Sequence, residues 1–91
     1  MYGSARRGRV PERFDLVPPA GVRRVAKAMA AGAERYGEKN YLNGMPVEVC
    51  LNHAIRHLYQ WLEGDRSEDH FGHAAANVLM AMEIQTNGMR T

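Results

Sequence analysis

Residues 46–85 read PVEVCLNHAIRHLYQWLEGDRSEDHFGHAAANVLMAMEIQ, and this segment decides the fold. Apolar residues recur along it at steps of three and four, which is the spacing of one face of an α-helix. Gly64 interrupts the pattern, so the segment predicts two helices joined by a short connection. The positions expected to face the core are Cys50, Ala54, Leu58, Trp61 and Leu62 in the first helix, and Phe71, Ala74, Ala75, Val78, Leu79 and Met82 in the second.

Residues with known positional preferences mark the ends of these two helices. Pro46 suits the first helical position, because its missing N–H would be unpaired there in any case. Ser67 is a good N-cap for the second helix, and it is followed by acids that the helix dipole favours. Asn87-Gly88 is a turn signal and predicts the end of the second helix.

A further amphipathic helix is predicted over residues 19–36, with Gly37 as its C-cap. No segment alternates polar and apolar residues over a useful length, as a strand would. The sequence therefore predicts an all-α protein with three main helices. A basic irregular arm is expected over residues 1–14, and a single helical domain over residues 15–91. The basic residues of the arm are Arg6, Arg7, Arg9 and Arg13.

Length and composition limit the classes of protein to consider. A chain of 91 residues forms one domain, and it buries only roughly two-thirds of its unfolded surface, so a self-partner, metal or cofactor is expected to add stability. Cys50 is the single cysteine, which excludes an intramolecular disulfide, and its apolar neighbours indicate a core residue. No apolar run approaches the roughly 18 residues of a membrane helix, and no secretory signal is recognisable, so a cytoplasmic protein is expected.

Each predicted helix also carries polar residues at helical spacing. In the last helix, one stripe contains His70, His73 and Asn77, at steps of three and four, and an alternative stripe contains Asp69, His73 and Asn77, at steps of four. His53 and His57 are also four residues apart. Taken singly, such residues are more typical of a hydrated helix surface than of a binding site. If the helices form a bundle, however, the polar stripes could line one cavity, which is where bundles build metal and ligand sites.

Four segments resemble, in order and spacing, the phage dATP/dGTP diphosphohydrolase (MazZ-like) family of the MazG-like all-α NTP pyrophosphohydrolases. The most specific pieces are the 32–37 block GAERYG with Asn40, the triplet at 56–58, and HAAAN at 73–77. MazG-like enzymes typically carry an ExxE motif on one helix and an ExxD motif on a later one. Neither motif stands at its place on the predicted helices, and Asn77 loosely occupies the place of the Asp. The four segments are DLVPP (15–19), GAERYGEKNY (32–41), HAIRHLYQWLEGD (53–65) and EDHFGHAAANVLMAMEIQ (68–85).

The resemblance implies a MazG-like helical bundle completed by a homodimer or homotetramer. It implies cleavage of a purine (deoxy)nucleoside triphosphate, (d)GTP or dATP/dGTP, to the monophosphate and pyrophosphate, with Mg²⁺ or Mn²⁺ as cofactor, in phage nucleotide metabolism in the host cytoplasm. The residues it assigns are Glu34, Asp69 and His73 for catalysis, Glu34, Glu38, Glu63, Asp69 and His73 as metal ligands, and Arg56, Lys39, Asn40, His57 and Asn77 for substrate binding.

Two other functions compete with this interpretation. The missing acidic motifs favour a helical module that binds a nucleotide or a metal without catalysis. The basic arm favours an interaction protein, which would bind nucleic acid in a strongly salt-dependent way. Nucleic acid is not expected as a partner, however, because the acids at the start of the last helix would repel a phosphate backbone.

Overall fold

The computed structural model describes residue 4 and residues 6–89, and all the regular structure in this part of the chain is helical. The all-α prediction with three main helices is therefore confirmed. The described residues leave out the outer ends of the predicted arm and of the predicted helical domain, which are residues 1–3, 5 and 90–91. The elements are η1 (Phe14–Leu16), α1 (Pro19–Tyr36), η2 (Asn40–Leu42), α2 (Val47–Leu62) and α3 (His70–Met89), where η marks a short 3₁₀ helix.

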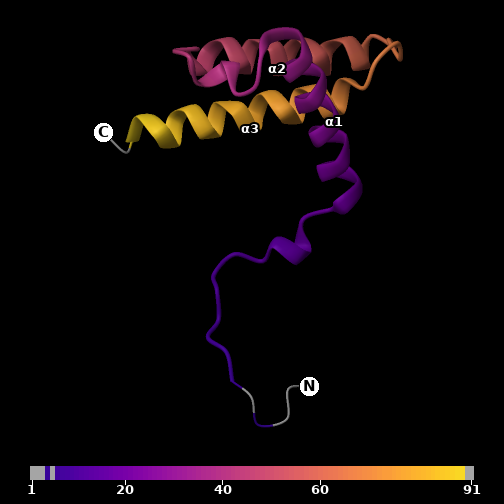
Figure 1. The fold of residues 1–91 in the computed structure, drawn as a ribbon. Helices are drawn as coiled ribbons and strands as arrows, with labels where there is room; N and C mark the ends of the chain where they lie inside the picture. The colour runs from indigo at the N-terminus through magenta and orange to yellow at the C-terminus, as the bar shows by residue number, and fades with distance from the viewer. Residues whose placement is uncertain (1–3, 5, 90–91) are drawn as a thin grey trace.

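The helices α2 and α3 form an antiparallel hairpin and lie side by side along much of their length (Figure 1). Helix α1 crosses the beginning of α3, and η2 also touches α3. The segment before α1 leads away from the three helices (Figure 1). Helix α3 therefore lies at the centre of the arrangement, because α1, α2 and η2 all contact it.

The connection between α2 and α3 is closed by Arg66. Its guanidinium donates a hydrogen bond of 2.7 Å to the carbonyl of Trp61, in the last turn of α2, and lies 4.2 Å from the centre of the Trp61 ring. Gly64 supplies the positive φ of 97° that the turn needs. The Trp61 ring also packs 5.0 Å from that of Phe71, so this contact joins the two helices beside the turn.

The predicted beginnings of α2 and α3 are corrected by the structure. Pro46 is the N-cap of α2 and not its first residue. Helix α3 begins at His70. The backbone N–H of Gly72, in the first turn of α3, donates a hydrogen bond of 3.0 Å to the Asp69 carboxylate. Ser67 is not the cap, because its own N–H donates to Asp65 Oδ1 at 2.9 Å and holds it in the preceding turn.

The predicted end of α3 at Asn87-Gly88 is also wrong, since the helix continues to Met89. An Asn or a Gly costs at most about 1 kcal/mol relative to Ala inside a helix. Such a cost in the last turn is too small to stop a helix whose other residues favour it.

Helices α1 and α3 touch at Gly72, where the backbones approach closely. A Cβ at this position would lie 2.4 Å from Asp69 Oδ2 and 3.1 Å from the carbonyl oxygen of Arg24. Asp69 also forms a bidentate ion pair with the Arg24 guanidinium, which holds the pKa of Asp69 well below its usual range. Asp69 therefore both caps α3 and ties α1 to it.

Few side chains are buried in the single chain. The buried apolar residues are Cys50 and four alanines of α2 and α3, while Leu58, Phe71 and Leu79 of the expected core are 42–49% exposed. Burial raises the pKa of the Cys50 thiol, which agrees with its predicted place in the core. Two apolar stripes stay uncovered: Leu51, Ile55, Leu58 and Leu62 on α2, and Phe71, Ala75, Val78, Leu79 and Met82 on α3.

The surface of the chain is also larger than that of a closed monomer of this mass. It exposes 7747 Å², whereas a folded monomer of 10.2 kDa exposes about 5,300 Å². Its radius of gyration is 16.7 Å, against about 12 Å for a compact domain of this length. The expected core positions on the two stripes are therefore wrong for the isolated chain, because nothing within residue 4 and residues 6–89 covers them.

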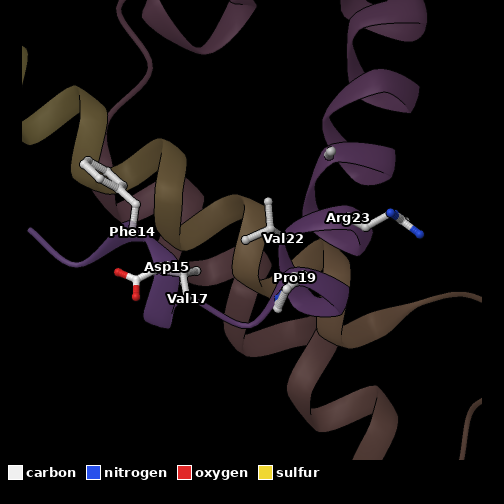
Figure 2. A pocket seen from close by; sticks show the side chains of 7 residues that line it. Phe14, Asp15, Val17, Pro19, Val22 and Arg23 are labelled. Carbon is white, nitrogen blue, oxygen red and sulfur yellow. The ribbon is translucent and has the colours of Figure 1, made fainter. Parts of the chain in front are cut away.

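A surface hollow lies where η1 meets the beginning of α1. The residues that line it include Phe14, Asp15, Val17, Val22 and Arg23 (Figure 2). None of the residues that the sequence assigns to a site lines this hollow. No helix within the described residues is long and apolar enough to span a membrane.

Candidate metal centre

Three histidines meet where α2 and α3 approach their shared connection. His57 comes from the second half of α2, and His70 and His73 come from the first turn of α3. The His57 ring lies 5.3 Å from that of His70 and is stacked 5.1 Å from that of His73. The antiparallel hairpin thus brings together imidazoles that are 13 and 16 residues apart in the sequence.

A chain of hydrogen bonds runs from Asp65 through His70 to His57. His70 Nε2 lies 3.1 Å from Asp65 Oδ2, and His70 Nδ1 lies 3.0 Å from His57 Nδ1. The His70 side chain is fully buried, so both of its ring nitrogens are satisfied by these two partners. Hydrogen bonds from Ser67, and from His70 after it, lower the pKa of Asp65 to about 2.

Glu68 faces the two outer imidazoles of this cluster. Its Oε1 lies 3.6 Å from His57 Nδ1 and 3.8 Å from His73 Nε2. One ligand atom from each of the three residues lies within 4.8 Å of the others. Atoms that bind one ion at about 2.1 Å lie up to about 4.2 Å apart, so a small closure would bring the three around a metal.

The electrostatics of the cluster suit a metal ligand. Burial lowers the pKa of His57, and this effect outweighs the opposing attraction of Glu68. Neutral imidazole is the form that binds metals. His73 and Glu68 are more exposed than His57, with side chains 34% and 45% accessible, so the cluster is open to solvent on their side.

The other residues assigned from the sequence are not among the ligand atoms of this cluster. Asp69 is held by Arg24 and by the N–H of Gly72, and Asn77 donates from its side chain to the carbonyl of His73 at 2.9 Å. Within the described residues, the remaining side chains form no hydrogen bond or ion pair, and their assigned roles stay predictions. They are Glu34, Glu38, Lys39, Arg56 and Glu63, which are exposed, and Asn40, which is half-buried.

The sequence analysis assigns no site role to Asp65, Glu68 or His70, although helical spacing places His70 on one stripe with His73 and Asn77. The sequence predicts Glu68 as an acid at the start of α3, but the helix begins two residues later and leaves Glu68 beside the imidazoles. The sequence indicates Asp65 only as part of the connection. The register of the hairpin, which pairs His57 with His70, is the signal that the sequence alone did not give.

Comparison with known proteins gives one match. A family model described as "dATP/dGTP diphosphohydrolase, N-terminal" matches residues 3–91, which is nearly the whole chain. No curated protein and no solved structure matches it significantly.

Proposed function

The chain belongs to the dATP/dGTP diphosphohydrolase N-terminal family, and on that premise we propose that it hydrolyses a purine deoxynucleoside triphosphate to the monophosphate and pyrophosphate. The observation that carries this proposal is the group His57, Glu68 and His73, because phosphate chemistry needs a divalent ion and this group has the donors to hold one. We place the reaction in phage nucleotide metabolism, within the host cytoplasm.

Mg²⁺ or Mn²⁺ is the ion proposed for the reaction, and the donor atoms of His57, Glu68 and His73 would hold it. When bound, such an ion neutralises phosphate charge and lowers the pKa of a bound water. We propose that Arg56, exposed beside His57, binds phosphate oxygens through its guanidinium. Water would attack the α-phosphorus, and the bond to the bridging oxygen would break with its electron pair leaving on pyrophosphate.

The proton released by that water needs an acceptor, for which we propose the exposed carboxylate of Glu34 on α1. We assign Lys39 and Asn40, in the turn after α1, to the triphosphate and the base. Within the described residues, Glu34 is not part of the group of ligand atoms that His57, Glu68 and His73 form. We therefore propose that a second copy completes the site.

Self-association would also cover the apolar surface that the single chain leaves exposed. The excess over a closed monomer is on the order of 2,400 Å² for one chain, part of which belongs to the segment before α1, and a stable interface buries about 600–1,000 Å² of each partner. The four-residue stripe on α2 and the five-residue stripe on α3 are the natural contact surfaces, because their residues recur with helical spacing. We propose a homodimer or homotetramer formed through them.

We expect Ile55→Glu to prevent this assembly, because the new charge would have to be buried against the partner. Light scattering after size exclusion would show the wild type at twice or four times the chain mass and the variant at a single mass. Val49→Glu is the matched control, since Val49 is exposed on α2 but lies off the stripe, and it should assemble normally. A monomeric wild type would contradict the proposed assembly.

The reaction is tested with a panel of all NTPs and dNTPs in the presence of Mg²⁺ or Mn²⁺. We expect dATP and dGTP to give equimolar monophosphate and pyrophosphate, and chelation of the metal to abolish the activity. Release of inorganic phosphate, or a preference for pyrimidines, would contradict the proposal. Binding of a nucleotide without turnover would favour the non-catalytic module, for which the engagement of Asp69 by Arg24 also speaks.

A further inference from the structure

The segment from η1 to the first turns of α1 exposes three large apolar side chains. Phe14 is 78% exposed, Val17 48% and Val22 51%, and neither η1 nor α1 contains a buried residue. The hydrogen bonds of η1 join residues 13–17 only to one another. Ordering a residue costs about 1–2 kcal/mol, and so short a turn cannot offset that cost without packing. A covering surface is therefore expected from outside the described part of the chain.

The hollow between η1 and α1 suits an apolar partner better than a small polar ligand. Its charged lining residues are Asp15 and Arg23, and the other lining residues are apolar. The Asp15 carboxylate already accepts hydrogen bonds of 2.9 and 2.7 Å from Arg13, which leaves Arg23 as the lining charge without an ion pair among the described residues. A site for a small ligand needs several convergent polar groups. The hollow thus favours a row of apolar side chains with an acid beside it.

The four-residue stripe on α2 has these matching properties. Its side chains are 41–71% exposed. Glu48 lies one turn before the stripe, and Glu63 follows its last residue. The charges of the chain divide in the same way, because residues 1–36 contain eight Lys and Arg against three Asp and Glu, whereas residues 37–91 contain four against seven. Opposite charges favour encounter and fix orientation. The stripe therefore complements the hollow in both apolar character and charge.

A second copy of the chain is the partner that carries both surfaces. Within one chain, α1 and α2 both pack against α3, and the stripe and the hollow both stay exposed. In a pair of copies, a two-fold axis makes the same contact twice, because each copy offers its stripe to the hollow of the other. The two contacts together then supply the area of about 600–1,000 Å² that each partner of a stable interface buries.

We propose that the α2 stripe of one copy docks into the hollow between η1 and α1 of a second copy, and that a two-fold axis repeats this contact. The inference rests on the self-association in the proposed function, and it names the surface that covers the stripe. It makes η1 an interface element, with Phe14 and Val17 against the stripe and Arg23 beside the acids at its ends.

Cross-linking tests which surfaces meet. In a chain with both Val17→Cys and Ile55→Cys, the new thiols of two copies would lie on the two sides of the contact, and a short bis-maleimide reagent should give a covalent dimer on a denaturing gel. Chains with either substitution alone should stay monomeric on that gel, since Cys50 is fully buried and does not compete. A covalent dimer from Ile55→Cys alone would show stripe against stripe and overturn the docking. The absence of a covalent dimer from the double variant would also overturn it.

The mass of the assembly gives an independent measurement. We expect Phe14→Glu to lower the assembled mass at least two-fold in light scattering after size exclusion, because a carboxylate would enter an apolar contact. Phe14 is largely exposed, so circular dichroism should show an unchanged helix content. Tyr36→Glu is the matched control, since Tyr36 is an exposed aromatic residue at the other end of α1 that does not line the hollow, and it should assemble normally. Equal masses for Phe14→Glu and the wild type would overturn the docking.

The docking and the proposed function fail separately in these experiments. A wild type that assembles, together with a Phe14→Glu variant that assembles equally, would remove the docking and keep the self-association. A monomeric wild type would remove the self-association and the docking with it. The panel of nucleotides tests the hydrolysis independently of both.

Discussion

Replacing Gly72 with alanine is expected to destabilise the chain by about 2–3 kcal/mol. The added Cβ would lie 2.4 Å from Asp69 Oδ2, so the carboxylate would have to leave both the N–H of Gly72 and the Arg24 guanidinium. It would also lie 3.1 Å from the Arg24 carbonyl, which belongs to the backbone of α1 and cannot rotate away. Urea unfolding followed by circular dichroism measures the loss.

Gly32→Ala is the matched control for this experiment. Gly32 lies inside α1, and a Cβ there would meet nothing within 4 Å. Alanine should therefore raise the free energy of unfolding by up to about 1 kcal/mol, as it does in helix interiors. In a double-mutant cycle, Gly72→Ala should cost less when Asp69 is already alanine. Equal stabilities of the Gly72 and Gly32 variants would show that the contact between α1 and α3 is not tight.

The helices could be predicted from the sequence because their signals are local. Apolar spacing and the residues Pro19 and Gly37 gave α1 its observed bounds from 19 to 36. The start of α3 could not be predicted in this way. Ser67 and Asp69 both have side chains that can cap a helix. In the structure, Asp65 holds Ser67 in the preceding turn, and Asp69 is bound by Arg24, which lies 45 residues away from it in the sequence. A local pattern carries no information on that partner.

The candidate site shows the same division between local and distant information. Helical spacing indicates His73 and His57 as candidate site residues, and the structure brings them together. Glu68 and the buried pair Asp65–His70 join them only through the register of the hairpin. The predicted core differs from the observed one for a related reason. Apolar spacing identifies the apolar face of a helix, but it does not show whether the same chain covers that face. Leu79 is 49% exposed although its spacing is that of a core residue.

His73→Ala is expected to lower turnover of dATP or dGTP by about 100- to 1,000-fold, comparable to the 2.7–4 kcal/mol lost with one oxyanion donor. The reason is that His73 supplies one of three donors to the proposed metal, and a two-donor site would hold the ion weakly. Its side chain is 34% exposed, so the helices should remain folded. Pyrophosphate release at saturating nucleotide measures the effect.

The control is His53→Ala. This variant removes an exposed imidazole one turn before His57 on α2 and leaves the residues of the cluster unchanged. Its turnover should equal that of the wild type. Circular dichroism and light scattering must be unchanged in both variants, so that a loss of activity reports on the site and not on folding or assembly. If His73→Ala retains wild-type turnover under these conditions, the histidine cluster is not where the nucleotide reacts, and the reaction centre must be built from Glu34 and its neighbours instead.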